Sequence, residues 1–282
     1  AVVLPFSYDN STERAKIRKL ELAIQMGVEE RQNYDPVDLA VDIYQTTSGD
    51  DPIMTQADYA ADSHMRPTEV KKYYDGAVYM KKFLDFIGAP KNSFNIIKES
   101  KVWSLFYEMG KSLSKNFGDD PESQVRKNET MNSYFGVILY QIHVGVSGNT
   151  ARTHIREYSK NIVNSVDNED FNDDVADMVD DLSDSLQDDE IHSTSDLMQS
   201  LTDENDTVEA LGDTFDTYMR NARNSESVDK FIRNIKQNVK YYHDLNEDGG
   251  LIGSLRYNEV SEDQLKELQK YMRDLNQLSK EL

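Results

Sequence analysis

The chain has 282 residues, with 31 Lys and Arg against 52 Asp and Glu, so its formal net charge is −21. It contains no cysteine, which excludes disulfides, thiolate metal sites and cysteine nucleophiles. No apolar run approaches the roughly 20 residues that span a bilayer, and residues 1–5 lack the basic and apolar pattern of a signal peptide. We therefore expect a cytoplasmic protein without a membrane partner.

The charge is concentrated in the second part of the chain. Residues 1–118 carry 15 basic and 17 acidic side chains, a net of −2, whereas residues 119–282 carry 16 and 35, a net of −19. Residues 161–219 hold 19 Asp and Glu without one Lys or Arg. We expect two domains, 1–118 and 119–282, of which the second repels polyanions and serves oligomerisation or binding of a protein partner.

Cap signals and the helical spacing of apolar residues predict helices along the whole chain. Asn10 with Glu13 is typical of a capping box before a helix over about residues 11–26. Asp35, followed by a proline, and Thr55 predict the starts of two more helices. Further helices are expected at about residues 66–80, 81–87, 93–115, 122–144, 149–163, 228–245 and 261–282. Strand signals are weak, so the sequence predicts an all-α protein.

Residues 56–75 fit the helix-turn-helix template, in which the second helix enters the major groove of DNA. Small or apolar side chains fall where the two helices face each other: Tyr59, Ala60, Ser63, Met65, Val70 and Tyr73. The outward residues are suited to contact bases or phosphates, and they are Arg66, Thr68, Lys71 and Lys72, with Lys81 and Lys82 as further phosphate contacts. His64 holds the turn position where glycine is usual. The alternative is an ordinary helical hairpin with solvated lysines.

The run ELAIQMGVEERQNYDPVDLA at residues 21–40 resembles the stretch that leads into the central domain of the ParB/KorB family. There an Arg and an Asp or Asn precede a proline that opens a helix, as Arg31, Asp35 and Pro36 do here. Next come a helix, a short break, Thr55-Gln56-x-x-x-Ala60 and Arg66-x-x-x-Val70, in the family's order.

The resemblance covers about residues 20–90. It implies sequence-specific binding of double-stranded DNA, usually by a homodimer, in plasmid or chromosome partition or in transcriptional repression, and hence a bacterial, plasmid or phage context. The Gly-Glu-Arg-Arg type motif of the family's nucleotide-binding domain is missing. The resemblance therefore implies neither CTP binding nor nuclease activity for this chain.

The acidic stretch over residues 167–216 keeps a helical apolar stripe that consists of Phe171, Val175, Met178, Leu182 and Leu186. Its acidic face fits a mimic of the phosphate backbone, an arm that shields the basic helix, a docking site for a protein, or simply a solvated surface. The alternative to DNA binding is therefore an acidic interaction or structural protein of a phage or plasmid, in which the helix-turn-helix is only scaffold.

The remaining polar residues predict no catalytic site. Asp244, Asn246 and Asp248 match the first half of a calcium loop, but Leu255 replaces the bidentate Glu of the twelfth position. A helix-terminating loop is the main interpretation, and a weak metal site is the alternative. The five histidines never occur at the paired spacing of a helical zinc site. We expect no cofactor and no enzymatic activity.

Overall fold

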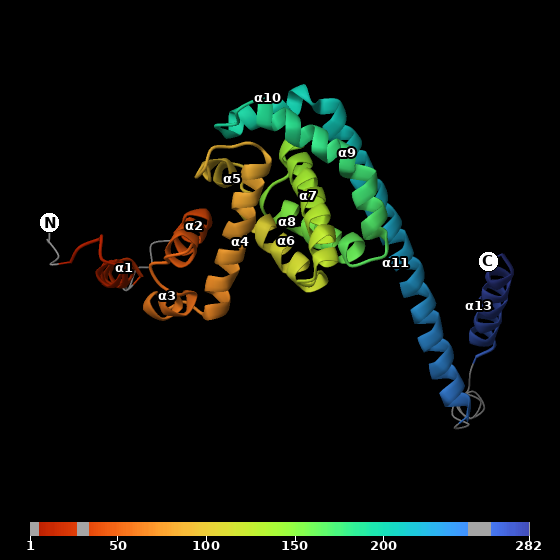
Figure 1. Ribbon diagram of the computed structural model, residues 1–282. Coiled ribbons are helices and arrows are strands. Elements are labelled where there is room, and N and C mark those ends of the chain that lie inside the picture. Colours follow the sequence, from red (N-terminus) through yellow and green to blue (C-terminus); the bar gives the residue numbers. More distant parts are fainter. Residues whose placement is uncertain (1–5, 27–33, 248–260, 282) are drawn as a thin grey trace. The chain divides into compact units, whose positions relative to one another are not determined.

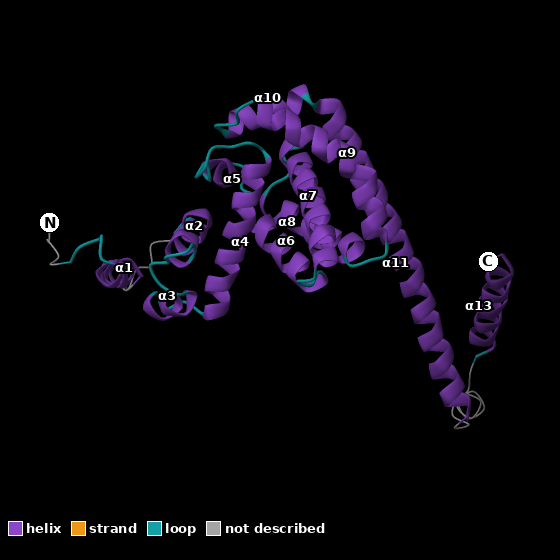
Figure 2. Cartoon of the chain, viewed as in Figure 1, coloured by secondary structure: helices purple, strands orange, loops and turns teal. Residues whose placement is uncertain are grey.

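The computed structural model describes residues 6–26, 34–247 and 261–281. All regular structure in these ranges is helical, without a strand, as Figures 1 and 2 show. The all-α prediction is confirmed. Among the described helices, none is long and apolar enough to cross a membrane. The chain divides into two compact units, Ala1–Ala222 and Arg223–Leu282.

The first unit contains the helices from α1 to the first part of α11. Their bounds are α1 (Ser11–Met26), α2 (Pro36–Thr47), α3 (Gln56–Asp62), α4 (Pro67–Phe86), α5 (Asn95–Glu99), α6 (Trp103–Asn116), α7 (Pro121–His143), α8 (Gly148–Tyr158), the π-helix η1 (Ser159–Val163), α9 (Asp167–Asp188), α10 (Thr194–Asp203) and α11 (Asn205–Glu247). The side chains of Asp35 and Thr55 accept hydrogen bonds from backbone N–H groups in the first turns of α2 and α3. These two helix starts are therefore confirmed together with their caps.

Three helix boundaries differ from the expectation. The two helices expected at residues 66–87 are the single helix α4, because its buried stripe continues through Phe83. The helix expected over residues 93–115 is two, α5 and α6, since Lys101 between them has φ +57°. A right-handed helix cannot continue through this left-handed conformation. The helix expected over residues 228–245 is part of the longer α11.

One hydrophobic core extends through most of the first unit. Its buried side chains come from α2 and from every helix between α4 and α11, on both sides of Gly118. The ring of Tyr158 packs edge-on against Phe171 of α9 and Phe215 of α11, with centroids 5.3 and 5.7 Å away. The domain boundary expected at Gly118 therefore falls inside one compact unit.

The acidic helix α9 belongs to this core. Four residues of its expected apolar stripe are buried, namely Phe171, Val175, Leu182 and Leu186, and Met178 is partly buried. The helix lies close to α7 because Gly136 has no side chain: a Cβ there would lie 2.7 Å from Val179 Cγ2. The acidic stretch is thus a fixed part of the unit and not a detachable arm.

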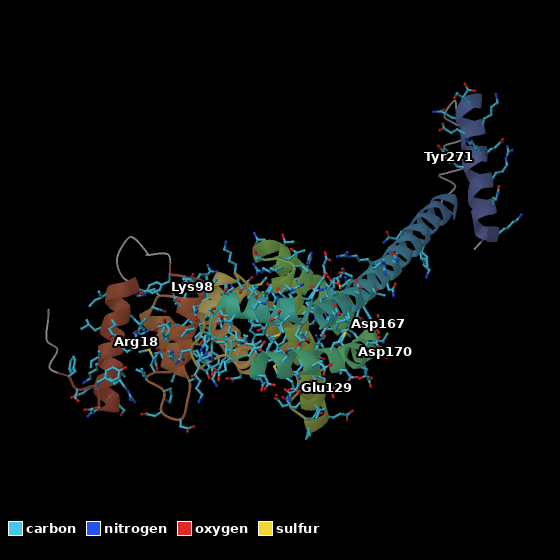
Figure 3. The ribbon with its side chains drawn as sticks, turned by 90° about the horizontal axis from the view of Figure 1, so that it is seen from above. Arg18, Lys98, Glu129, Asp167, Asp170 and Tyr271 are labelled. Atoms are coloured by element: carbon cyan, nitrogen blue, oxygen red, sulfur yellow. The ribbon has the colours of Figure 1, made fainter. Side chains whose placement is uncertain are left out.

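The second unit contains the end of α11 and α13 (Glu262–Glu281). α13 begins with the expected capping box, in which Ser261 Oγ accepts from the Gln264 N–H at 3.3 Å and Gln264 Oε1 accepts from the Ser261 N–H at 3.1 Å. Tyr271, labelled on α13 in Figure 3, is 57% exposed. Asp244 and Asn246 lie in the last turn of α11. Asp248 lies outside the described residues, so the weak calcium site stays an alternative that only the sequence offers.

Candidate DNA-binding surface

The connection between α3 and α4 has the geometry of a tight interhelical turn, over residues 63–66. His64 has φ +55°, which is the left-handed conformation that glycine usually supplies in such turns. The N–H of Met65 donates to the carbonyl of Ala60 at 3.1 Å, and Ser63 Oγ donates to the carbonyl of Tyr59 at 2.6 Å. His64 therefore keeps the left-handed turn although it is not a glycine. Figure 1 shows α3 beside the first turns of α4.

A second, smaller core cluster stabilises this pair of helices. It consists of Leu22, Ile43, Met54, Tyr59, Ala60 and Val70, which α1 to α4 and the loop before α3 contribute. Met65 and Tyr73 pack against it while partly buried, and Ser63 is buried. All six side chains expected at the contact between the two helices are thus buried or half-buried.

A buried polar group fixes α3 to its neighbours. The Tyr59 hydroxyl donates a hydrogen bond of 2.6 Å to Asp42 of α2. Asp42 also pairs with Arg18, which Figure 3 labels on α1. Burial, and then the neighbouring Asp42 carboxylate, raise the pKa of Tyr59, so its hydroxyl stays protonated and donates. The sequence motif did not indicate this group, because its three members come from three different helices.

Three of the four basic residues of α1 are neutralised by nearby carboxylates. Arg14 pairs with Asp51 at 2.6 Å, and Lys19 pairs with Asp62 of α3 at 2.8 Å. Arg18 is occupied by Asp42 in the same way. These side chains therefore contribute to the packing of α1 and not to a free basic face.

Three of the expected DNA contacts lie together at the start of α4. Arg66, Thr68 and Lys71 are all exposed, in the N-cap and the first two turns. Lys71 forms an ion pair with Asp75 one turn later, at 2.8 Å. Exposed pairs at this spacing contribute only about 0.3–0.5 kcal/mol, so a phosphate can replace the carboxylate.

Lys72 has a different environment from these three residues. Its Nζ lies 5.4 Å from the ring centroids of Tyr73 and Trp103 and 5.0 Å from that of Tyr107. The rings of Tyr73 and Trp103 are stacked, with an interplanar angle of 11°. Cation–π attraction by these aromatic faces holds the ammonium against α6. Lys72 therefore joins α4 to α6, a role that the motif did not indicate.

Lys81 and Lys82 lie in the last two turns of α4. At 1.5 Å per residue they are about 21–23 Å along the axis from its first residue. Lys81 Nζ is 3.8 Å from Asp85, and Lys82 Nζ lies 5.7 Å from the ring centroid of Tyr79. Burial, and then the nearby Lys127, lower the pKa of Lys82. The structure thus places these two lysines apart from the exposed group at the start of the helix.

No protein-family model matches the chain, and neither a curated protein nor a solved structure does. Among the residues whose side chains the structure describes, no group of three His, Asp or Glu is arranged to hold a metal ion.

Proposed function

We propose that this protein binds double-stranded DNA through α3, the turn at His64 and the start of α4. The observation that carries the proposal is the left-handed turn, which leaves Arg66, Thr68 and Lys71 exposed. The side chains expected between α3 and α4 are at the same time buried or half-buried. In helix-turn-helix proteins the first residues of the second helix contact base edges. Arginine and lysine suit guanine or phosphate, and threonine suits either.

The resemblance to the ParB/KorB central domain supports the same proposal and adds a role in plasmid or phage partition or repression. Because one recognition helix reads only a few base pairs, binding as a homodimer supplies a second half-site, about 34 Å away along the duplex. The proposed surface has only three exposed cationic or hydroxyl groups, and the chain has a net charge of −21. Because two of these groups are cations that displace counterions from phosphates, we expect affinity to fall with salt, at a slope of about −2 per protomer in log K against log salt concentration.

The experiment is selection of bound duplexes from a random-sequence pool by the full chain, followed by fluorescence anisotropy on the selected duplex. Replacing Arg66 and Lys71 by Ala removes two expected contacts, each with a typical cost of about 1–3 kcal/mol. The control removes the same charge at Lys91 and Arg126, two exposed residues outside α3, the turn and α4. The proposal requires at least tenfold weaker binding by the first variant and an intact control, and enrichment of no duplex would refute it.

The exposed face of α9 favours a second candidate, an acidic docking surface for a basic protein. Nine carboxylates of α9 are exposed: Glu169, Asp170, Asp173, Asp174, Asp177, Asp180, Asp181, Asp184 and Asp188. In the part of the chain that the structure describes, none of them forms an ion pair with Lys or Arg. Figure 3 labels Asp170 near the start of this helix.

The second candidate is tested by charge removal, because α9 contributes to the core and its deletion would unfold the unit. Asn replaces Asp173, Asp177, Asp180 and Asp184, which lie on one side of the helix. The control neutralises four exposed acids elsewhere, Asp9, Asp50, Asp119 and Glu122. The measurement is crosslinking of the full chain to its partners in source cells. The docking proposal requires that a basic protein crosslinks to the wild type and to the control but not to the α9 variant. If the α9 variant and the control retain this protein equally, the docking proposal is contradicted.

A further inference from the structure

A concentration of basic side chains lines a hollow on the first unit, away from the turn at His64. The hollow has a volume of about 310 Å³ and lies between α6, α8 and the π-helix η1. Its cationic residues are Lys111, Lys115, Arg156 and Lys160, and its single carboxylate is Glu108. Four cations around one acid are unexpected in a chain with 52 acidic and 31 basic residues.

The carboxylate of Glu108 is already occupied by two guanidinium groups. Its Oε1 accepts hydrogen bonds from Arg152 at 2.6 and 2.8 Å and from Arg156 at 2.6 Å. Burial alone would raise the pKa of Glu108, but the hydrogen bonds from Arg156 and Arg152 outweigh it and hold the pKa below its ordinary value. The group therefore stays ionised, and it orients the arginines.

Lys111 and Lys115 lack a comparable partner. Neither forms an ion pair with any residue that the structure describes. They are one helical turn apart on α6, so about 6 Å of axial rise separates them. At this spacing the two like charges repel each other. An anion between them removes that repulsion.

Besides the cations Arg156 and Lys160, the wall opposite α6 contains hydroxyl groups. Ser159 Oγ donates to the carbonyl of Ile155 at 2.7 Å and lies 2.6 Å from the Tyr134 hydroxyl. Because the serine proton is used in this way, Tyr134 donates to Ser159. Burial raises the pKa of Tyr134, which keeps its hydroxyl protonated. The wall therefore adds no negative charge to the hollow.

The π-helix explains why these groups meet here. η1 directly continues α8 and widens the last turn over residues 159–163. Ser159, Lys160 and Asn164, at the start and just after the end of this wide turn, all line the hollow. Short π-helical segments within α-helices are frequent at functional sites.

We propose that this hollow binds a compact ligand with two or more phosphate groups, of the pyrophosphate or nucleoside polyphosphate class. Paired lysines one turn apart match adjacent phosphates, and an oriented guanidinium binds a third set of oxygens through its planar fork. The volume is at the lower end of that of small-ligand sites. A recess lined by cations attracts a small polyanion even on an acidic protein, because a cleft focuses the local field.

The test is isothermal titration of the full chain with inorganic pyrophosphate and with ATP at low ionic strength. Replacing Lys111 and Lys115 by Ala lowers the affinity for both ligands at least about tenfold. Replacing Lys91 and Arg126, two exposed residues outside the hollow, removes the same charge and leaves affinity unchanged. Absence of binding to the wild type, or equal weakening in both variants, overturns the proposal.

Two further measurements keep the outcome clear. Pyrophosphate protects Lys111 and Lys115 of the wild type from chemical acetylation, a readout that needs no variant; unprotected lysines contradict the proposal. Duplex affinity, measured on the same variants, stays at the wild-type value if the occupant is a small ligand. If the Lys111 and Lys115 variant loses duplex binding and the wild type does not bind pyrophosphate, the hollow contacts the DNA backbone and the proposal is overturned. The variant at Arg66 and Lys71 tests the proposed DNA-binding surface independently of this result.

Discussion

The hydroxyl of Tyr59 donates a hydrogen bond of 2.6 Å to Oδ2 of Asp42. The other oxygen of Asp42 pairs with Arg18, so one carboxylate connects α1, α2 and α3. The Tyr59 side chain is fully buried, and water cannot easily replace Asp42 as its acceptor. The placement of α3, and with it the turn at His64, therefore depends on this hydrogen bond.

Replacing Tyr59 by Phe removes the donor but keeps the ring in the smaller core cluster. We expect the free energy of unfolding to fall by about 1–3 kcal/mol, because Asp42 loses a buried partner. Urea denaturation at neutral pH measures the change. Tyr8, which is 60% exposed, provides the control, and Tyr8→Phe leaves the stability unchanged. Equal stability of the Tyr59 variant and the wild type would contradict the proposed role of this bond.

Buried tyrosines make the protein sensitive to alkaline pH. Burial is the main cause that raises the pKa of Tyr59, Tyr134 and Tyr158 above the ordinary value of 10.0. The unfolded chain then loses its tyrosine protons first, so their contribution to stability is complete below pH 10 and decreases as the pH rises above it. Urea midpoints measured from neutral pH to above pH 10 check the sign. Tyr59→Phe makes the decrease shallower.

Replacing His64 by Gly should stabilise the protein. An L-residue in the left-handed conformation costs about 1–2 kcal/mol, whereas the extra chain entropy of glycine costs roughly 0.5–1 kcal/mol. The expected net gain is about 0.5–1 kcal/mol in the free energy of unfolding. The same substitution at His154, inside α8, lowers stability by about 0.3–0.5 kcal/mol. A loss at both positions would mean that the turn conformation imposes no strain.

Loss of the charge at Lys72 and at Lys71 should change different properties, the tryptophan emission and the duplex affinity respectively. Lys72→Met removes the ammonium from the faces of Trp103 and Tyr107, and each cation–π contact contributes roughly 0.5–1 kcal/mol. Trp103 is the single tryptophan of the chain, so its fluorescence emission reports this change directly. Lys71→Met leaves the emission unchanged and weakens duplex binding. Unchanged emission after Lys72→Met would contradict the aromatic placement of its ammonium.

The sequence predicts the helix starts well because a cap needs only residues a few positions apart. Thr55, for example, accepts from the N–H of Asp58 at 3.1 Å. The environment of Lys72 could not be predicted in this way, since Trp103 and Tyr107 are about 30 residues away and belong to another helix. The motif therefore identified the exposed start of α4 but treated Lys72 as part of it.

The domain boundary shows a second limit of sequence reasoning. The change in charge near Gly118 describes surfaces, whereas compact units depend on which apolar side chains pack together. Phe135 of α7 packs against Phe83 of α4, with ring centroids 5.5 Å apart, across this position. Such contacts between distant segments are invisible to composition. The acidic helices therefore share one core with the nearly neutral segment that precedes them.

Tyr158 and Tyr134 allow the free-energy cost of an unpaired buried hydroxyl to be compared with that of a hydrogen-bonded one. Their rings lie edge-to-face, 4.8 Å apart, and Phe at either position preserves this contact. The Tyr134 hydroxyl is bonded to Ser159 at 2.6 Å, whereas that of Tyr158 has no hydrogen-bond partner among the described residues. An unpaired buried hydroxyl costs about 1–3 kcal/mol, and a formed hydrogen bond contributes about 1 kcal/mol.

We therefore expect substitutions of opposite sign at these two positions. Tyr158→Phe raises the free energy of unfolding by about 1 kcal/mol, because it removes a polar atom that the core leaves unsatisfied. Tyr134→Phe lowers the free energy by a similar amount, because Ser159 loses its donor. Guanidinium denaturation, followed by the emission of Trp103, measures both. A loss of stability with Tyr158→Phe would show that its hydroxyl has a partner in solution, such as a bound water molecule.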